Sequence, residues 1–131
     1  MQLKTTTEYA VRLMIYLART QRMTAAAEIA KETEIPLNYL VTITRYMRNA
    51  GLITATSGNR GGDRLRKKTS EITLFDILMC MEGTLKINRC LESTQERACP
   101  ENPCPLRDCY QQLQQHIEAY LTGITLESLL Q

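Results

Sequence analysis

Apolar side chains recur at helical spacing through the first part of the chain. Three helices are predicted there, over residues 7–19, 25–33 and 36–50. The first shows the i, i+3, i+4, i+7 pattern of a buried helical face, at Ala10, Leu13, Met14 and Leu17. Thr24 is the predicted N-cap of the second helix. Pro36 suits the first turn of the third, because that position needs no partner for a backbone N–H.

The third predicted helix has two different faces. Its apolar residues share one side, which would contact a core: Leu40, Ile43 and Met47. Its polar residues form a stripe at i, i+4, i+7 and i+11 on another side: Asn38, Thr42, Arg45 and Asn49. A helix can read the major groove of DNA only when one face is polar and another anchors it to the protein. The pattern is therefore typical of a recognition helix.

A glycine-rich hairpin is predicted after this helix. Strands over 52–56 and 64–67 flank a tip at residues 58–62, where three glycines allow positive φ and a close approach to another surface. Three helices followed by such a hairpin predict a mainly α fold, a winged helix–turn–helix. A further helix over 73–81 ends at Gly83.

The rest of the chain divides into a loop and a long helix. Residues 84–105 are rich in cysteine and proline and are predicted to be neither helix nor strand. The final helix is predicted over 106–121. Apolar residues recur from its start in alternating steps of four and three, the spacing of a heptad seam, at Leu106, Tyr110, Leu113, Ile117, Tyr120 and Ile124. Such a seam predicts a homodimer. We expect three units: a DNA-binding domain (1–83), a cysteine-rich loop (84–105) and a dimerisation helix with the C-terminal segment (106–131).

Charge is distributed unevenly along the chain. Residues 1–70 carry twelve Lys or Arg and five Asp or Glu, a net +7, whereas residues 71–131 carry a net −5. A basic front half attracts phosphate. The predicted DNA contacts lie on the third helix, in the wing and near the N-terminus: Asn38, Tyr39, Thr42, Arg45, Arg60, Arg64 and Lys4. The helix residues would meet base edges or phosphates, Arg60 would enter the minor groove, and Arg64 and Lys4 would neutralise phosphates.

Composition argues against several other classes of protein. No segment has the length of a membrane-spanning helix and no signal peptide is evident, so a cytoplasmic protein without a membrane partner is expected. The absence of Trp and the single Phe do not suit an RNA-stacking platform. No acid–base pair, nucleotide loop or nucleophile constellation supports catalysis, so the chain is not predicted to be an enzyme.

The cysteines follow the spacing Cys90-x8-Cys99-x4-Cys104, with Cys109 four residues further on. Five cysteines without an export signal argue against structural disulfides. Structural zinc sites usually use paired, closely spaced cysteines, whereas these gaps are long and rich in proline, which favours an iron–sulfur cluster. Zinc and redox-active thiols stay open as alternatives. Cys80, on an apolar helix, is interpreted as a small buried hydrophobic residue.

Together these features resemble the IscR/NsrR family of iron–sulfur winged-helix transcriptional regulators over essentially the whole length. The resemblance lies in the helices, the wing, the cysteines and the C-terminal run, at Thr7–Ala18, Asn38–Leu40, Arg48–Ile53, Gly61–Gly62, Ile72–Ile77, Glu82–Gly83, Cys104–Leu106 and Leu121–Leu126. It implies a homodimeric regulator of a DNA operator, with a repressor as the preferred form. The affinity for DNA would depend on a cluster that senses nitric oxide, redox state or iron availability.

The resemblance also implies the cluster ligands. Three cysteines fall on the ligating positions of the family: Cys90, Cys99 and Cys104. One branch of the family has a histidine three residues after the third cysteine, where this chain has Arg107. Glu8 stands where the nitric-oxide-sensing branch supplies an acidic ligand from the other subunit. Glu8 and Cys109 are both candidates for the fourth ligand, and [4Fe–4S] is favoured over [2Fe–2S].

The chain departs from the family pattern in three places. Ser57 stands where the wing usually carries an arginine before its first glycine, and Pro36 stands where a serine usually opens the recognition helix. These two changes lead us to expect a different base preference. The gap between the first two cysteines is also longer than usual, which leaves the number of irons open. The alternative function is a thiol- or zinc-dependent DNA-binding dimer without an iron–sulfur cluster.

Overall fold

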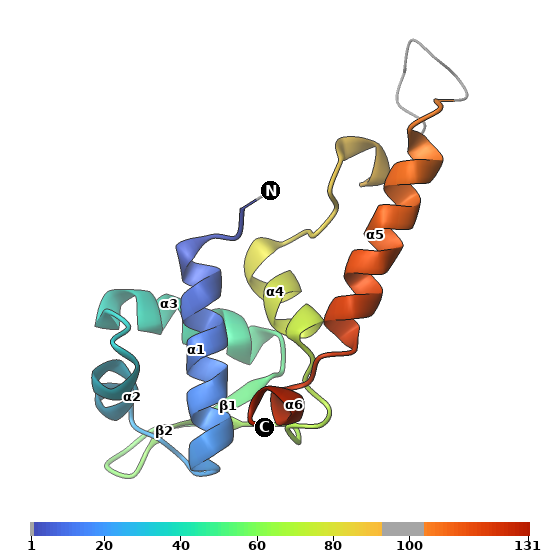
Figure 1. Cartoon of the computed structure of the whole chain (residues 1–131). Helices are drawn as coiled ribbons and strands as arrows, with labels where there is room; N and C mark the ends of the chain where they lie inside the picture. Colours follow the sequence, from blue (N-terminus) through green and yellow to red (C-terminus); the bar gives the residue numbers. More distant parts are fainter. Residues whose placement is uncertain (1, 93–103) are drawn as a thin grey trace.

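A computed structural model describes residues 2–92 and 104–131 of the chain. Its elements are, in order, α1 (Thr5–Thr20), α2 (Ala26–Thr33), α3 (Leu37–Asn49), β1 (Ile53–Thr56), β2 (Gly62–Leu65), α4 (Leu74–Glu82), the 3₁₀ turn η1 (Arg89–Leu91), α5 (Arg107–Thr122) and α6 (Leu126–Leu129). In Figure 1, α2 lies on one side of α1, α4 and α5 lie on the other, and α3 crosses behind α1. The predicted mainly α architecture with one hairpin is confirmed, and α6 is an additional element.

The core forms around α1 because one face of this helix is apolar throughout. The four positions predicted from the spacing are at most 1% exposed: Ala10, Leu13, Met14 and Leu17. Residues from the other elements and from the loop before α4 pack around them: Ile29, Leu40, Ile43, Met47, Ile53, Ile72, Ile77 and Leu126. Burying one such side chain fully contributes about 1.5–3 kcal/mol. The three-helix module, the hairpin, α4 and α6 therefore share a single hydrophobic core.

The start of α2 differs from the prediction. Ala25 occupies the N-cap position and no side chain caps this helix, so the assignment of Thr24 as N-cap was wrong. Instead the backbone of Thr24 pairs with Asp63 of β2, with two N–H···O bonds of 2.9 Å. Pro36 likewise precedes α3 at its N-cap position and does not lie in the first turn. Pairing with the hairpin thus overrides the local capping preference of Thr24.

The hairpin, or wing, is anchored at its base. β1 and β2 are antiparallel, and Thr56 lies opposite Gly62. The returning strand begins at Gly62, earlier than the predicted 64–67, because Asp63 pairs with Thr24 as well as with β1. Gly62 has a φ of 150°, and a Cβ atom there would lie 2.1 Å from the carbonyl oxygen of Thr24. Glycine is therefore the residue that lets β2 approach the segment before α2.

Helix α5 packs against α4 and η1. Half of the predicted seam faces away from its own chain: Leu106, Leu113 and Tyr120 are 52%, 45% and 71% exposed. The alternate seam residues are half-buried: Tyr110, Ile117 and Ile124. After α5 the chain returns to the core, where the Leu126 N–H donates to the Ile72 carbonyl at 2.9 Å. No helix in the described ranges combines the length and apolar character needed to cross a membrane.

Candidate nucleic-acid interface and cysteine segment

Helix α3 presents the two faces that its sequence predicts. Leu40, Ile43 and Met47 are at most 1% exposed and anchor the helix in the core. The opposite side carries the exposed residues Asn38, Arg45 and Asn49, with Thr42 half-buried beside them. The polar stripe is therefore solvent-facing and stands on a rigid base. This is the geometry that a helix needs in order to enter a major groove.

Two of the predicted contact residues on α3 also rest on neighbouring aromatic rings. The ring of Tyr39, which is 45% exposed, lies 5.8 Å from the ring of Tyr9 on α1. The Arg12 guanidinium lies 5.3 Å from the Tyr9 ring centroid. Arg45 similarly lies 5.9 Å from the ring of Tyr46. These contacts limit the rotamers of Tyr39 and Arg45, so less side-chain entropy is lost when they bind a ligand.

The remaining predicted DNA contacts lie at the margins of α3. Arg60 is exposed in the turn between β1 and β2, Arg64 is exposed on β2, and Lys4 is the exposed N-cap of α1. Within the described residues none of these three side chains forms an ion pair with a carboxylate. Their charges therefore stay available for phosphates.

Arg48, which the sequence analysis did not single out, links the end of α3 to the wing. Its Nε lies 3.4 Å from Asp63 Oδ1, and its Nη2 donates to Thr44 Oγ1 at 2.9 Å. Asp63 is 6% exposed, and Oδ1 has no hydrogen-bond partner in the described part of the chain. Burial raises the pKa of the Asp63 carboxyl, and the charge of Arg48 partly offsets this shift. The pair links the wing to the end of α3, although no periodicity in the sequence points to it.

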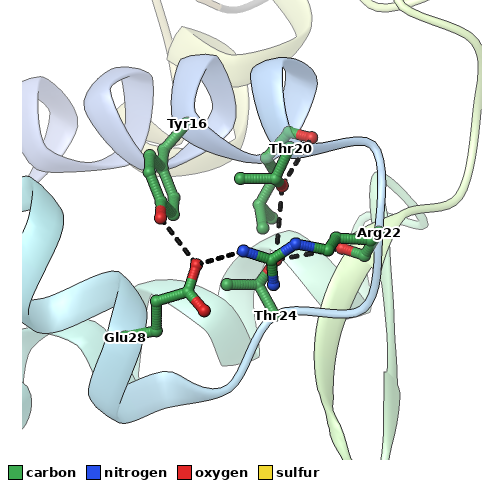
Figure 2. Close-up of polar contacts among 6 residues, drawn as sticks. Tyr16, Thr20, Arg22, Thr24 and Glu28 are labelled. Atoms are coloured by element: carbon green, nitrogen blue, oxygen red, sulfur yellow. Dashed lines mark hydrogen bonds and ion pairs between the residues drawn. The ribbon is translucent and has the colours of Figure 1, made fainter.

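A polar network holds α2 against the end of α1 (Figure 2). The Tyr16 hydroxyl and Arg22 Nη2 both donate to Glu28 Oε2, each at 2.7 Å. The hydroxyls of Thr20 and Thr24 lie 3.2 Å apart beside it. Hydrogen bonds from Arg22 and then Tyr16 lower the pKa of Glu28, and the bond to Glu28 raises the pKa of Tyr16.

Glu28→Gln is expected to weaken the pH dependence of stability. A carboxyl with a lower pKa in the folded state stabilises that state above its unfolded pKa, and the contribution disappears as the pH falls through the folded pKa. The fall in Tm between pH 7 and pH 3 should therefore be about 2 °C smaller in Glu28→Gln than in the parent protein. Thermal unfolding with Glu32→Gln, an exposed site on the same helix, is the control. Equal pH dependence in the parent and Glu28→Gln proteins would contradict this role of the network.

The structure places two of the predicted cluster ligands on segments next to α5. Cys90 lies in η1, which packs on α5, and Cys104 lies just before α5 begins. Both are half-buried free thiols, whereas Cys109 on α5 is exposed. Cys99 lies outside the described residues. Glu8 is on α1, where its side chain is 66% exposed and accepts from Arg12 at 2.6 Å.

Within one chain, the described residues do not gather these side chains into a metal-binding group. No set of three His, Cys, Asp or Glu residues there is close enough to hold an ion. Cys80, interpreted as a buried hydrophobic residue, is half-buried on α4, and its thiol donates to the Tyr46 carbonyl at 3.2 Å. Burial raises the pKa of this thiol, which keeps it protonated. Cys80 therefore contacts the end of α3 and is not part of the Cys90 segment.

Gln114 is a site residue that the sequence analysis missed. It lies on α5 and is only 4% exposed. Its Oε1 accepts from the Ile87 N–H at 2.8 Å, and its Nε2 donates to the Leu85 carbonyl at 3.0 Å. An ion pair of 3.1 Å between Lys86 Nζ and Glu118 Oε1 lies alongside. The amide thus fixes the segment leading to Cys90 onto α5. Its spacing from Tyr110 and Ile117, which puts the three on one helical face, is the sequence signal that could have identified it.

Comparison with known proteins identifies the relatives of this arrangement. The chain matches the family model Rrf2, described as an iron-dependent transcriptional regulator, over residues 3–131. It is 31% identical to the HTH-type transcriptional regulator NsrR of Shouchella clausii over 92% of this chain and 80% of that protein.

Solved structures agree with this match. CymR, the global cysteine regulator of B. subtilis, is similar with a TM-score of 0.78 and 26% identity over 98% of this chain and 95% of that one. IscR of T. potens has the same fold, with a TM-score of 0.74 and 24% identity over 99% of this chain and 86% of that one. The predicted resemblance to the IscR/NsrR regulators and the predicted fold are confirmed. The chain therefore belongs to the Rrf2 family of transcriptional regulators.

Proposed function

We propose that this regulator is a homodimer that represses transcription from a palindromic, partly A·T-rich operator. The observation that carries the proposal is the exposed polar face of α3, held beside an anchored wing whose arginines form no ion pair in the described ranges. Asn38, Thr42 and Arg45 would read base edges, with Tyr39 at the margin. Arg60 would enter the minor groove, and Lys4 and Arg64 would neutralise phosphates.

Asn38→Ala is expected to weaken and broaden DNA recognition. Asn38 lies in the exposed first turn of α3, where an amide can bond both N6 and N7 of adenine. Losing this contact should weaken the binding free energy by about 1–3 kcal/mol for a duplex selected from a randomised library. Fluorescence anisotropy at fixed salt measures the loss of affinity. Lys4→Ala is the control: it should weaken binding to all duplexes alike, and a series of salt concentrations should show a slope lower by about one. An equal loss for Asn38→Ala on selected and unrelated duplexes would contradict base reading.

Two apolar surfaces support the homodimer. One is the outward line of Leu106, Leu113 and Tyr120 on α5. The other is a groove of about 650 Å³ on α1, α4 and α5, whose apolar lining is Leu3, Val11, Ile15, Leu74, Leu78 and Leu121. A second copy that covers both surfaces would remove them from water and set the distance between the two recognition helices.

The thiols near α5 fit the donor set of an iron–sulfur cluster, for which Cys thiolates are the usual ligands. Cys90 and Cys104 are free and half-buried on segments that flank Cys99 in the sequence. Cys90, Cys99 and Cys104 would hold the cluster, with [4Fe–4S] favoured over [2Fe–2S]. The cluster would supply reactivity toward nitric oxide or oxygen and a dependence on iron.

Glu8 is the proposed fourth ligand, contributed across the dimer. It lines the same 650 Å³ groove that a second copy would cover, so its carboxylate would face the other subunit in such a dimer. Its bond to Arg12 is solvent-exposed and costs little to break. Cys109, which is exposed on α5, is the other candidate for this position.

The path from the cysteines to DNA would run through packed helices. Gln114 couples the Cys90 segment to α5, and α5 packs on α4. At the end of α4, Glu82 Oε2 accepts from the Thr7 hydroxyl at 2.5 Å and from the Lys4 N–H at 3.3 Å. A displacement of α5 would therefore reach the start of α1 and, through the shared core, the orientation of α3.

Anaerobic purification with an absorption spectrum and iron and sulfide assays tests the cluster. We expect a brown protein with about four irons per subunit that nitric oxide bleaches and that loses operator binding on bleaching. Cys99→Ala should lose the colour and the response, whereas Cys80→Ala should keep both because Cys80 is not a proposed ligand. A Cys99→Ala protein with a full cluster and normal switching would contradict these ligands.

The second candidate is a thiol- or zinc-dependent regulator without a cluster. The similarity to CymR, described as the global cysteine regulator of B. subtilis, favours it. This candidate predicts a colourless protein that fails reconstitution with iron and sulfide. Its DNA affinity would then change with a thiol oxidant or with zinc.

A further inference from the structure

The recognition helix exposes apolar side chains next to its polar stripe. Val41 is 59% exposed and Leu37 is 55% exposed, and the two lie one turn apart on the same edge of α3. Asn38 and Arg45 are the polar residues adjacent to this edge. The face proposed to enter the major groove is therefore apolar along one margin.

Neither packing nor helix formation accounts for Val41. It opens a run of four β-branched residues, of which Ile43 and Thr44 are at most 3% exposed and belong to the core. Val41 is largely outside that core. Valine also restricts side-chain freedom in a helix, so an exposed Lys, Gln or Glu would support α3 better at this position. An exposed apolar side chain on this face gains free energy only when a ligand covers it.

The major groove offers one apolar group, the C5-methyl of thymine. We propose that Val41 is a specificity-determining residue that packs against a thymine methyl, with Leu37 beside it. This inference rests on the proposed DNA binding. Exposed basic residues favour DNA as the occupant over a second protein: Arg45 one turn after Val41 on α3, and Arg60 and Arg64 on the wing.

Asn38 extends the proposal to an A·T pair. It stands three residues before Val41, and side chains at this spacing on a helix lie about 5–6 Å apart at Cβ. The Asn38 amide can bond adenine N6 and N7 while Val41 meets the methyl of a thymine in the same or the neighbouring pair. Recognition of thymine would thus depend on a group that uracil lacks.

The test replaces thymine by uracil in a selected duplex. Wild-type protein first selects its preferred duplex from a randomised double-stranded library, and each thymine of one half-site is then changed to deoxyuridine in turn. We expect one position to lose about fourfold in affinity, the effect of removing one buried methyl group. In Val41→Ala, thymine and uracil at that position should bind equally well.

Thr122→Ser is the control, because it removes a methyl from an exposed position of α5, away from α3, and should keep the thymine preference. Unfolding midpoints show whether each variant is folded. Unchanged affinity at every uracil position, or full uracil sensitivity in Val41→Ala, would overturn the inference while leaving DNA binding intact. Failure to select any duplex would overturn the proposed function, and with it the role of Val41 in reading thymine.

Discussion

Replacing Gly62 with alanine is expected to destabilise the protein by about 3 kcal/mol and to displace the wing. The φ of Gly62 is 150°, a value that residues with side chains rarely adopt. Its Cβ would lie 2.1 Å from the oxygen and 2.4 Å from the carbon of the Thr24 carbonyl. Backbone atoms cannot turn aside as a side chain can. Relief therefore requires breaking the two hydrogen bonds between Thr24 and Asp63.

Urea and thermal unfolding measure this effect, and the Tm of Gly62→Ala should fall by about 10 °C. Gly123→Ala is the matched control, because its φ is −80° and its Cβ would lie 3.4 Å from the nearest atom, the Ala119 carbonyl oxygen. A Tm for Gly62→Ala within about 2 °C of the parent protein would show that the wing does not depend on this contact.

Gln114→Leu is expected to lower the free energy of unfolding by about 2–3 kcal/mol and to release the Cys90 segment from α5. Leucine is similar in size to glutamine but makes no hydrogen bonds. The Ile87 N–H and the Leu85 carbonyl would each lose the partner that they have at 2.8 Å and 3.0 Å. The ion pair between Lys86 and Glu118 is partly exposed and cannot replace these bonds.

Hydrogen exchange of the apoprotein provides the specific readout for this variant. Amides 85–92 should exchange faster in Gln114→Leu, and the Cys90 thiol should react faster with maleimide, while α2 and α3 keep their protection. Gln112→Leu, a change of the same chemistry at an exposed position of α5, should leave both rates unchanged. Unchanged exchange of the 85–92 amides in Gln114→Leu would show that Gln114 does not hold the Cys90 segment on α5, whatever the effect of the substitution on metal binding.

The parts of the fold that the sequence predicts are those where local periodicity and burial agree. Leu13, Met14 and Leu17 repeat at helical spacing and are all buried in α1. The two faces of α3 follow for the same reason, since Leu40 and Ile43 alternate with polar residues. In such segments the spacing of apolar residues within one helix is enough to predict both the helix and its buried face.

Sequence analysis failed where a distant partner decides the local structure. Thr24 has the chemistry of an N-cap, but its pairing with Asp63 of β2 determines its role. Helix α6 was missed because it is only one turn long, with a Thr125–Ser128 capping box and a single buried anchor, Leu126. Helical periodicity needs more than one turn to become visible.

The candidate site is less accessible to sequence reasoning than the fold. The cysteine spacing and the exposed basic residues can be recognised from residue type alone. The amide of Gln114 cannot, because its importance comes from two backbone groups on another segment. Glu8 poses the same difficulty at a larger scale, since its proposed partners belong to a second subunit.

The burial of Leu126 has a consequence for how the chain can be divided. This residue is fully buried beneath α1, so the segment that follows the long helix completes the core that supports the recognition helix. A gene fragment ending at residue 83 would encode the whole reading head but leave a hole beneath it. A cut between the DNA-binding part and the cysteine segment would therefore remove part of the core on which the DNA-binding part itself depends.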